Sequence, residues 1–240
     1  MKTYKKYSKS FLTFTCTIGL LTLLLSSCSK PPVSYNYAPP VAALAFVQAS
    51  PDEPPVDFFL ADGKLNQAPI NYGQSFNYFS IVAGTDSVAF YNDATMKTIL
   101  ADAINFTKNT TYSMFLANKS TQPEIVLLQD TLAQPTAGNA AIRFINLSPD
   151  APAVDLVIKG GAVLVSNKSY KGYSSFAPVP GNMFYTLEVH QAGTATVLAT
   201  LTNFKLNTGF LYTVWFHGLA AGTTTADQLS VDIFNNAFFL

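Results

Sequence analysis

The chain has 240 residues, of which 49% are hydrophobic and only 12% charged, with 14 Lys and Arg against 14 Asp and Glu. Four of the lysines lie within the first nine residues, so the remainder has ten basic and fourteen acidic side chains, a net charge of about −4. Nucleic-acid binding normally depends on clustered Lys and Arg, and this composition argues against it. The apolar content also argues against a disordered chain.

The N-terminus is typical of a secretory signal. Four lysines between Lys2 and Lys9 precede an uncharged apolar run over residues 11–25, and Leu25-Ser26-Ser27-Cys28 follows. A membrane-spanning helix needs roughly 20 apolar residues, and the run of 15 is shorter and contains four threonines. The pattern therefore predicts that residues 1–27 are a signal peptide that is cleaved, rather than a retained anchor helix.

Leu25-Ser26-Ser27-Cys28 resembles the lipobox of bacterial lipoproteins. The resemblance implies that Cys28 receives a diacylglyceryl group and that, after cleavage, its new amine is acylated, typically with palmitate. The membrane would then be a partner through this N-terminal lipid, and we expect a location in the cell envelope, at the outer membrane of a Gram-negative bacterium. Each buried methylene contributes about 0.8 kcal/mol to anchoring. Cys16 would leave with the signal, so the folded part would contain neither a disulfide nor a free thiol.

Residues 28–40 contain Pro31, Pro32, Pro39 and Pro40. Prolines at this density exclude a helix and favour an extended path. The segment is therefore predicted to be a tether that holds the folded part away from the membrane, although a merely disordered N-terminus is an open alternative.

One eight-residue segment, called the Ser-Pro-Asp phrase below, occurs twice in the chain. Residues 50–57 read SPDEPPVD and residues 148–155 read SPDAPAVD, so six of eight positions are identical at a spacing of 98 residues. The pair Asn105-Phe106 returns at the same spacing as Asn203-Phe204. Such self-similarity indicates a duplicated structural unit. We predict one domain over residues 41–134 and a second over residues 139–240.

The segments around these phrases are short, rich in aromatic and β-branched residues, and bounded by Gly, Pro and Asn, which is typical of strands. No amphipathic helix is apparent. The pattern predicts two tandem β-sandwich domains of immunoglobulin-like or transthyretin-like type. The expected strands are 42–49, 56–60, 76–82, 87–91, 98–106, 112–117 and 124–130, followed by 141–147, 154–158, 174–179, 184–190, 197–204, 210–217 and 229–234.

The phrase Phe46-Val47-Gln48-Ala49-Ser50-Pro51-Asp52, and its second version from Arg143 to Asp150, resemble the signature of the bacterial family called domain of unknown function 4397. The resemblance covers about residues 41–240. It implies exported, often lipid-anchored, tandem β-domains of the cell envelope. It implies no catalytic residues and no cofactor, because none are defined for the family.

The acidic residues of the repeated phrase allow two interpretations. Ser50 and Asp52 can bond nearby backbone amides in turns, and Asp57 can fix the loop before the next strand. Alternatively, the carboxylates form an ion site, because calcium takes six to eight oxygen ligands. The candidate ligands are Asp52, Glu53 and Asp57 in the first copy and Asp150 and Asp155 in the second, where Ala151 replaces Glu53.

Other chemical signals are weak. His190 and His217 lack a second His or a Cys at metal-ligand spacing and are interpreted as strand residues. The sequence has no Gly-x-Ser-x-Gly, His-Glu-x-x-His or phosphate-binding loop. We therefore expect no enzyme, no metal and no cofactor, but a binding or spacer module for an envelope protein or a glycan. The alternatives are a subunit of a larger envelope assembly, suggested by the apolar end of the chain at residues 234–240, and a hydrolase with an unrecognised loop site.

Overall fold

The structure is a computed structural model that describes residues 40–225 and 227–239. These lie in one compact unit, Pro39–Leu240. The predicted signal peptide, Cys28 and nearly all of the tether fall outside the described residues. All regular elements of the described part are β-strands, so the predicted all-β fold is confirmed. The same residues contain no helix that is long and apolar enough to cross a membrane.

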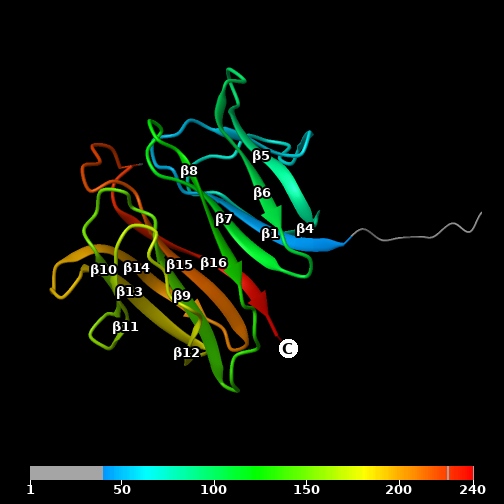
Figure 1. Ribbon diagram of the computed structural model, residues 1–240. Helices are drawn as coiled ribbons and strands as arrows, with labels where there is room; N and C mark the ends of the chain where they lie inside the picture. The colour runs from blue at the N-terminus through cyan, green and yellow to red at the C-terminus, as the bar shows by residue number, and fades with distance from the viewer. Residues whose placement is uncertain (1–39, 226, 240) are drawn as a thin grey trace, which may run out of the picture. The chain divides into compact units, whose positions relative to one another are not determined.

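The first half of the described chain forms a sandwich-like unit, here called unit 1, from two four-stranded sheets. One sheet has the order β4-β1-β7-β8 and the other β3-β2-β5-β6. β1 is antiparallel to β4 but parallel to β7. The strands can be followed in Figure 1 and are β1 (Val41–Gln48), β2 (Val56–Leu60), β3 (Gly63–Lys64), β4 (Ser75–Val82), β5 (Gly84–Asn92), β6 (Thr98–Phe106), β7 (Thr111–Ala117) and β8 (Glu124–Asp130).

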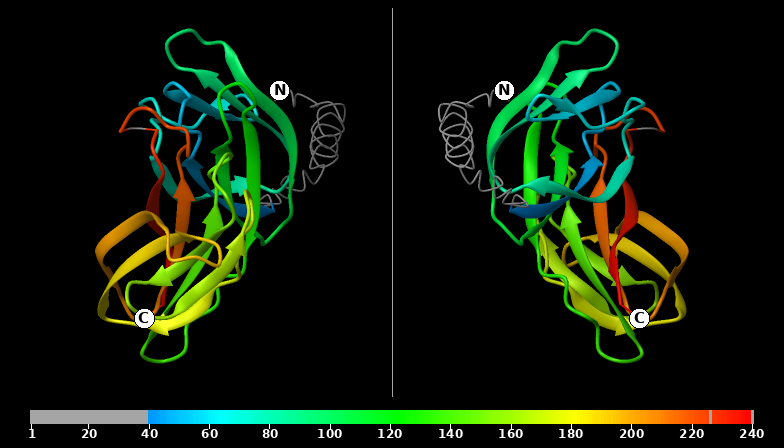
Figure 2. Two further views of the ribbon diagram at one scale, coloured as in Figure 1. Left: turned by 90° about the vertical axis from the view of Figure 1, so that its left-hand side faces the viewer. Right: turned by 90° about the vertical axis from the view of Figure 1, so that its right-hand side faces the viewer.

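The second half forms a sandwich-like unit 2 with the sheet orders β12-β9-β15-β16 and β11-β10-β13-β14. β9 is antiparallel to β12 and parallel to β15. Figure 2 shows these strands, in green to red, from two sides. They are β9 (Asn139–Asn146), β10 (Val154–Ile158), β11 (Val163–Lys168), β12 (Ala177–Pro180), β13 (Met183–Gln191), β14 (Val197–Leu206), β15 (Phe210–His217) and β16 (Ser230–Phe238).

The two units have the same strand order, with each number raised by eight in unit 2. They also share a corner built on tyrosine. The backbone N–H of Thr107 donates to the Tyr112 hydroxyl at 3.0 Å, and the N–H of Asn207 donates to the Tyr212 hydroxyl at 3.2 Å. In each case the tyrosine closes the turn that precedes its own strand, five residues upstream. A tyrosine of this kind fixes a strand entry in many β-sandwiches.

Each unit has its own hydrophobic core between its two sheets. In β7, Tyr112, Met114 and Leu116 point into the core of unit 1. The alternate residues Phe115 and Ala117 point to the other face, yet they are also fully buried. β15 repeats this arrangement with Tyr212, Val214 and Phe216 facing inward. Strands that are buried on both faces have near-continuous apolar sequences, which explains the runs at these two positions.

A third cluster of buried residues accounts for the outward faces. It joins unit 1 to unit 2 and is centred on Phe115, Ile145 and Trp215. The sheet β4-β1-β7-β8 therefore packs against the sheet β12-β9-β15-β16. The complete set is Val47, Ala49, Phe115, Ala117, Val126, Leu128, Ile145, Leu147 and Trp215, with Phe234 packed against it. Removing apolar surface from water stabilises the folded state by about 25 cal/mol per Å², so this cluster stabilises the contact between the two units.

Most expected strands are present, and five of them, β2, β6, β8, β10 and β15, have the predicted bounds. Two strands were not predicted. β3 has only two residues, and β11 has the sequence VLVSNK, in which half of the residues are polar. The strand expected at 174–179 is β12, Ala177–Pro180. At Ser174 the backbone N–H still donates to the carbonyl of Phe144, but the N–H of Phe144 donates to the Ser174 hydroxyl instead of a backbone carbonyl, and the regular strand begins only after this point.

Candidate functional site

The Ser-Pro-Asp phrases connect distant loops, which corrects the prediction of local turns. Asp52 accepts hydrogen bonds from the N–H of Ser120 at 2.7 Å and from its hydroxyl at 3.0 Å. Asp150 accepts from the N–H of Ala220 at 2.7 Å and pairs with Lys119 at 3.0 Å. The partners lie 68 and 70 residues away along the chain. Each phrase thus fixes the loop that follows the central strand of its own unit.

The serines of the two phrases differ. The hydroxyl of Ser50 donates to the carbonyl of Asn118 at 2.6 Å, and its N–H donates to Gln48 at 2.7 Å. The N–H of Ser148 donates to Asn146 at 2.9 Å. The hydroxyl of Ser148 is buried and has no hydrogen-bond partner among the described residues.

Asp57 and Asp155 hold the loops beside β2 and β10. Asp57 accepts from Asn66 and pairs with Lys64 at 2.7 Å. Burial would raise the pKa of the Asp57 carboxyl, but Lys64 and Asn66 outweigh burial and lower it. Asp155 accepts from the N–H of Asn167 at 2.7 Å and of Gly193 at 2.9 Å. Both carboxylates are therefore occupied by groups of the protein itself.

Glu53 behaves differently from the other acids of the phrase. One of its carboxylate oxygens is buried without a hydrogen-bond partner among the described residues. Burial, together with the negative charge of Asp52, raises the pKa of Glu53 from 4.5 to about 7. The described residues contain no group of three or more His, Cys, Asp or Glu side chains arranged to hold a metal ion. The carboxylates proposed as calcium ligands therefore form no such group within the described residues.

The two histidines lie on strands of unit 2. His190 in β13 pairs with Glu188 at 3.0 Å. His217 at the end of β15 is 3% exposed, stacks on Trp215 with 3.9 Å between ring centroids, and bonds Asp232 at 3.0 Å. Its other ring nitrogen bonds the Tyr72 hydroxyl of unit 1.

Tyr72, His217 and Asp232 are hydrogen-bonded in the order of a nucleophile, a base and an acid. The pKa shifts of Tyr72 and His217, however, are those of a structural contact. Burial, with Asp232 and Asp227 nearby, raises the pKa of the Tyr72 hydroxyl, so this group remains protonated. Burial lowers the pKa of His217 despite the contact with Asp232. A neutral imidazole and a protonated phenol form a stable hydrogen bond between the two units.

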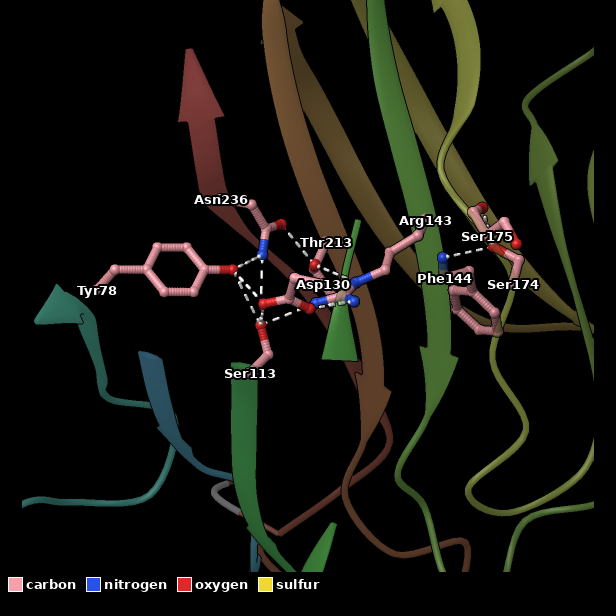
Figure 3. Close-up of polar contacts among 9 residues, drawn as sticks. All are labelled: Tyr78, Ser113, Asp130, Arg143, Phe144, Ser174, Ser175, Thr213 and Asn236. Atoms are coloured by element: carbon pink, nitrogen blue, oxygen red, sulfur yellow. Dashed lines mark hydrogen bonds and ion pairs between the residues drawn. The ribbon is translucent and has the colours of Figure 1, made fainter. Parts of the chain in front are cut away.

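A second polar contact between the units surrounds Arg143, the one arginine of the sequence (Figure 3). Arg143 lies on β9 and pairs with Asp130, the last residue of β8, at 2.5 Å. It also donates to the hydroxyl of Thr213 and to the hydroxyl of Ser113, each at 2.8 Å. The side chains of Arg143 and Asp130 are 3% and 0% exposed. An ion pair at this depth persists only where its remaining hydrogen bonds are made.

Further hydrogen bonds surround the second carboxylate oxygen of Asp130. Tyr78 donates to Asp130 at 2.5 Å and Ser113 donates to the same oxygen at 2.8 Å. Asn236 donates to the Tyr78 hydroxyl at 2.7 Å and accepts from Thr213 at 2.6 Å. Burial and the charge of Asp130 raise the pKa of Tyr78, which therefore remains a donor. The network draws on β4, β7 and β8 of unit 1 and on β15 and β16 of unit 2.

Arg143 and its counterpart in unit 1 differ greatly in size. Arg143 pairs with Thr213 in the parallel register of β9 and β15. The same register position in unit 1 is the pair of Ala45 with Ser113. Ala45 is 2% exposed. The small side chain in one unit and the long one in the other allow the two outward faces to pack without two facing cations.

A cavity of about 420 Å³ opens beside this network, where the segment that joins the two units passes over β9. Arg143 and Phe176 both line it, with 4.8 Å between the guanidinium carbon and the ring centroid. The volume lies within the range of about 300–1,000 Å³ that is usual for small-molecule sites. The lining residues are Gln129, Thr131, Ala133, Gln134, Pro135, Thr136, Ala141, Arg143, Tyr173, Ser174, Ser175, Phe176 and Pro178. A second cavity, of about 730 Å³, is lined by the single loop segment 65–76.

The sequence did not predict this cavity. Its walls come from β8, the joining segment, β9 and the loop before β12, which become neighbours only when the two units pack. The one signal in the sequence that could have indicated part of this site is Arg143, the single arginine, which lies between apolar strand residues. Because Arg is rarely buried unless it is paired, an arginine at such a position is a candidate for a buried ion pair.

Comparison with known proteins gives a family but no defined activity. Residues 42–157 match the family described as "Domain of unknown function (DUF4397)". No curated protein matches the chain. Among solved structures, the carbohydrate-binding module CBMbc, of family CBM26, from Eubacterium rectale Amy13K in complex with maltoheptaose aligns with 82% of this chain and 97% of its own. The sequence identity is 7% and the TM-score is 0.27.

Proposed function

We propose that this chain, whose residues 42–157 belong to the DUF4397 family, is a non-catalytic binding module of the bacterial cell envelope. In this proposal the lipid on Cys28 anchors the chain, residues 28–40 act as a tether, and the two packed sandwich units present a binding cavity. The observation that carries the proposal is the cavity at the junction, because a buried ion pair and an apolar cluster hold its two walls in fixed positions.

The anchoring part rests on the sequence alone. Basic head, apolar run and Leu25-Ser26-Ser27-Cys28 follow one another in the order that a lipoprotein signal requires. We expect the wild-type chain to incorporate radiolabelled palmitate and to enter the outer-membrane fraction of a Gram-negative host. Cys28→Ser should abolish the label and leave the precursor unprocessed. Normal labelling and processing of this variant would exclude Cys28 as the lipidated residue.

The binding part rests on geometry. A rigid, preformed site loses less free energy on binding than one that must first become ordered. The ion pair between Arg143 and Asp130 and the bond between Tyr72 and His217 connect the two units at separate points. The lining side chains therefore keep their relative positions without a ligand.

Filling the cavity tests the proposal. Ala133 lines the cavity and is exposed, so Ala133→Trp should occupy its space while leaving the sheets intact. Ala137 is also an exposed residue of the joining segment but does not line the cavity, and Ala137→Trp is the matched control. We expect wild type and Ala137→Trp to capture the same components from detergent-solubilised envelope, and Ala133→Trp to lose them. Equal capture by all three would contradict a binding role for the cavity.

An exposed apolar patch favours the second candidate, a subunit of a larger envelope assembly. Phe184 is 63% exposed, Phe238 is 58% exposed and Met183 is 52% exposed. Phe238 stacks on Phe210 at 5.5 Å between centroids, near the turns that begin β13 and β15. Exposed apolar clusters of this kind often mark protein contacts.

The double variant Phe184→Ser, Phe238→Ser tests the second candidate. It should reduce the size of the complex on native gels if the patch joins an assembly. Val163→Ser, at a 56% exposed valine of β11, serves as control. An unchanged complex in the double variant would reject this candidate.

A further inference from the structure

The geometry points to a neutral saccharide as the ligand of the junction cavity. This inference rests on the proposed binding function and adds the chemical class of the ligand. It draws on three observations: the charge of the lining, its free hydrogen-bonding groups and its aromatic rings. A fourth observation, the composition of the neighbouring edge strand, separates a saccharide from a peptide.

The charge of the lining excludes an anion as the preferred ligand. Arg143 is the one charged residue among the lining residues. Its guanidinium is neutralised by Asp130 at 2.5 Å and donates to Thr213 and Ser113. A phosphate or uronate would have to compete with Asp130 for this cation. Separating a buried ion pair costs several kcal/mol, so an uncharged ligand fits better.

The rim of the cavity carries neutral polar groups that are free to bind. Gln129, Thr131, Gln134 and Ser175 are exposed residues on both sides of the opening. Within residues 40–225 and 227–239 no hydrogen bond of their side chains is found, whereas the Ser174 hydroxyl is occupied by Phe144 and Ser175 backbone groups. Amide and hydroxyl side chains can donate and accept at once. This dual capacity matches the hydroxyl groups of a sugar.

Aromatic and proline rings supply the apolar part of the lining. Tyr173 is 52% exposed, and Phe176 and Pro178 lie beside it on the way into β12. An exposed ring with a polar tip provides a flat face for the C–H side of a pyranose while its hydroxyl remains in water. An exposed tyrosine at the mouth of a cavity with neutral polar walls is thus suited to bind a sugar ring.

A peptide would be expected to use the edge of the adjacent sheet. β12 is the edge strand of the order β12-β9-β15-β16, and its four residues include Pro178 and Pro180. Proline has no N–H, and an added strand needs main-chain hydrogen bonds along the edge. Two of the four residues of β12 have no N–H, so strand addition at this side of the cavity would have few main-chain donors, which favours the saccharide over an extended peptide.

The test uses the full chain in detergent and an array of neutral glucan, mannan and galactan oligosaccharides together with oligosaccharides of uronic acids. Affinities for the neutral oligosaccharides that are retained are then measured by calorimetry. Tyr173→Ala removes the ring, and Gln134→Ala removes one amide of the rim. Tyr91→Ala is the control, because Tyr91 is a partly exposed tyrosine of β5 that does not line the cavity. Circular dichroism and melting confirm the fold of each variant.

We expect a neutral oligosaccharide to bind. Tyr173→Ala should lose affinity about tenfold, which is the scale of one aromatic contact, and Tyr91→Ala should bind like wild type. Retention of uronic-acid oligosaccharides alone, no retention of any oligosaccharide, or equal affinity of Tyr173→Ala and wild type would overturn the inference. If the array is negative but Ala133→Trp still abolishes capture of envelope components, the binding function stands and only the saccharide is rejected. If capture is also unaffected, both proposals fail.

Discussion

Replacing Arg143 by methionine should remove the cation of the buried ion pair with Asp130 while preserving much of the side chain's length. Asp130 would remain fully buried, with only the hydroxyls of Tyr78 and Ser113 as donors. Removing one partner of a buried pair typically costs about 3–5 kcal/mol. For the whole compact part, Pro39–Leu240, a loss of one kcal/mol lowers the melting temperature by about 2–4 °C. The melting temperature of Arg143→Met should therefore fall by about 6–20 °C.

The measurement is equilibrium unfolding in urea, followed by circular dichroism, with melting curves as a second readout. Lys171→Met is the matched control, since Lys171 also pairs with an acid of unit 1, Glu124, at 2.9 Å, but the two side chains are 47% and 30% exposed. An exposed pair contributes about 0–1 kcal/mol. The double variant Arg143→Met, Asp130→Leu should lose less than the sum of its single variants, because it leaves no isolated charge. If Arg143→Met and Lys171→Met lose equal stability, the network does not hold the units together as argued.

The remaining predictions concern pH, packing and calcium. The pKa of Glu53 is raised from 4.5 to about 7, so the stability that depends on its protonated form is complete below 4.5 and is lost as the pH rises through about 7. Glu53→Gln should therefore melt higher than wild type at about pH 8 and equally at about pH 4; a constant difference at both pH values would count against the buried carboxyl. The pKa of His217 is lowered below 6.5 in the folded state. The stability that depends on neutral His217 is therefore complete above about 6.5 and is lost as the pH falls through the lower pKa of the folded state. His217→Gln should reduce the loss of unfolding free energy between about pH 7 and pH 5, and an unchanged slope would refute this assignment. Ala45→Arg should destabilise the chain by about 3–5 kcal/mol, because it buries a second cation opposite Ser113, where Asp130 is already paired with Arg143; a stable variant would show that the two faces do not pack tightly. Millimolar calcium should leave the melting temperature of wild type unchanged, because Asp57 and Asp155 are bound by groups of the protein. A rise in melting temperature would instead support a calcium site.

The sandwich units were predictable because their strands carry two local signals. Alternating apolar residues such as Tyr112, Met114 and Leu116 define one face of β7, and the repeated Ser-Pro-Asp phrase marks the break between the first two strands of each unit. β11 was not predicted because all of its residues are partly or fully exposed, so buried and exposed positions do not alternate along it. Local pattern predicts strands that border a core and fails for edges that border solvent.

The candidate site was less predictable because its residues come from both units. Asp130, Arg143 and Tyr173 have no shared motif or spacing, and their proximity follows from the packing of two sheets through a third core. The repeated acids attracted attention by their spacing, yet Asp52 and Asp150 hold loops in place. A repeat identifies what both units require for folding, and a binding site formed between the units depends on residues in which the copies differ.

Arg143 and Ala45 make this difference concrete. The two residues occupy the same register position in units of the same strand order, opposite Thr213 and Ser113. If both were arginine, two cations would meet in a dry interface; if both were alanine, Asp130 would lack its partner. One large and one small residue let the faces interlock in a single arrangement, and the joining segment is then held over β9, where the cavity forms. The divergence of the two copies at this position therefore contributes Arg143, a lining residue, to the binding site that we propose.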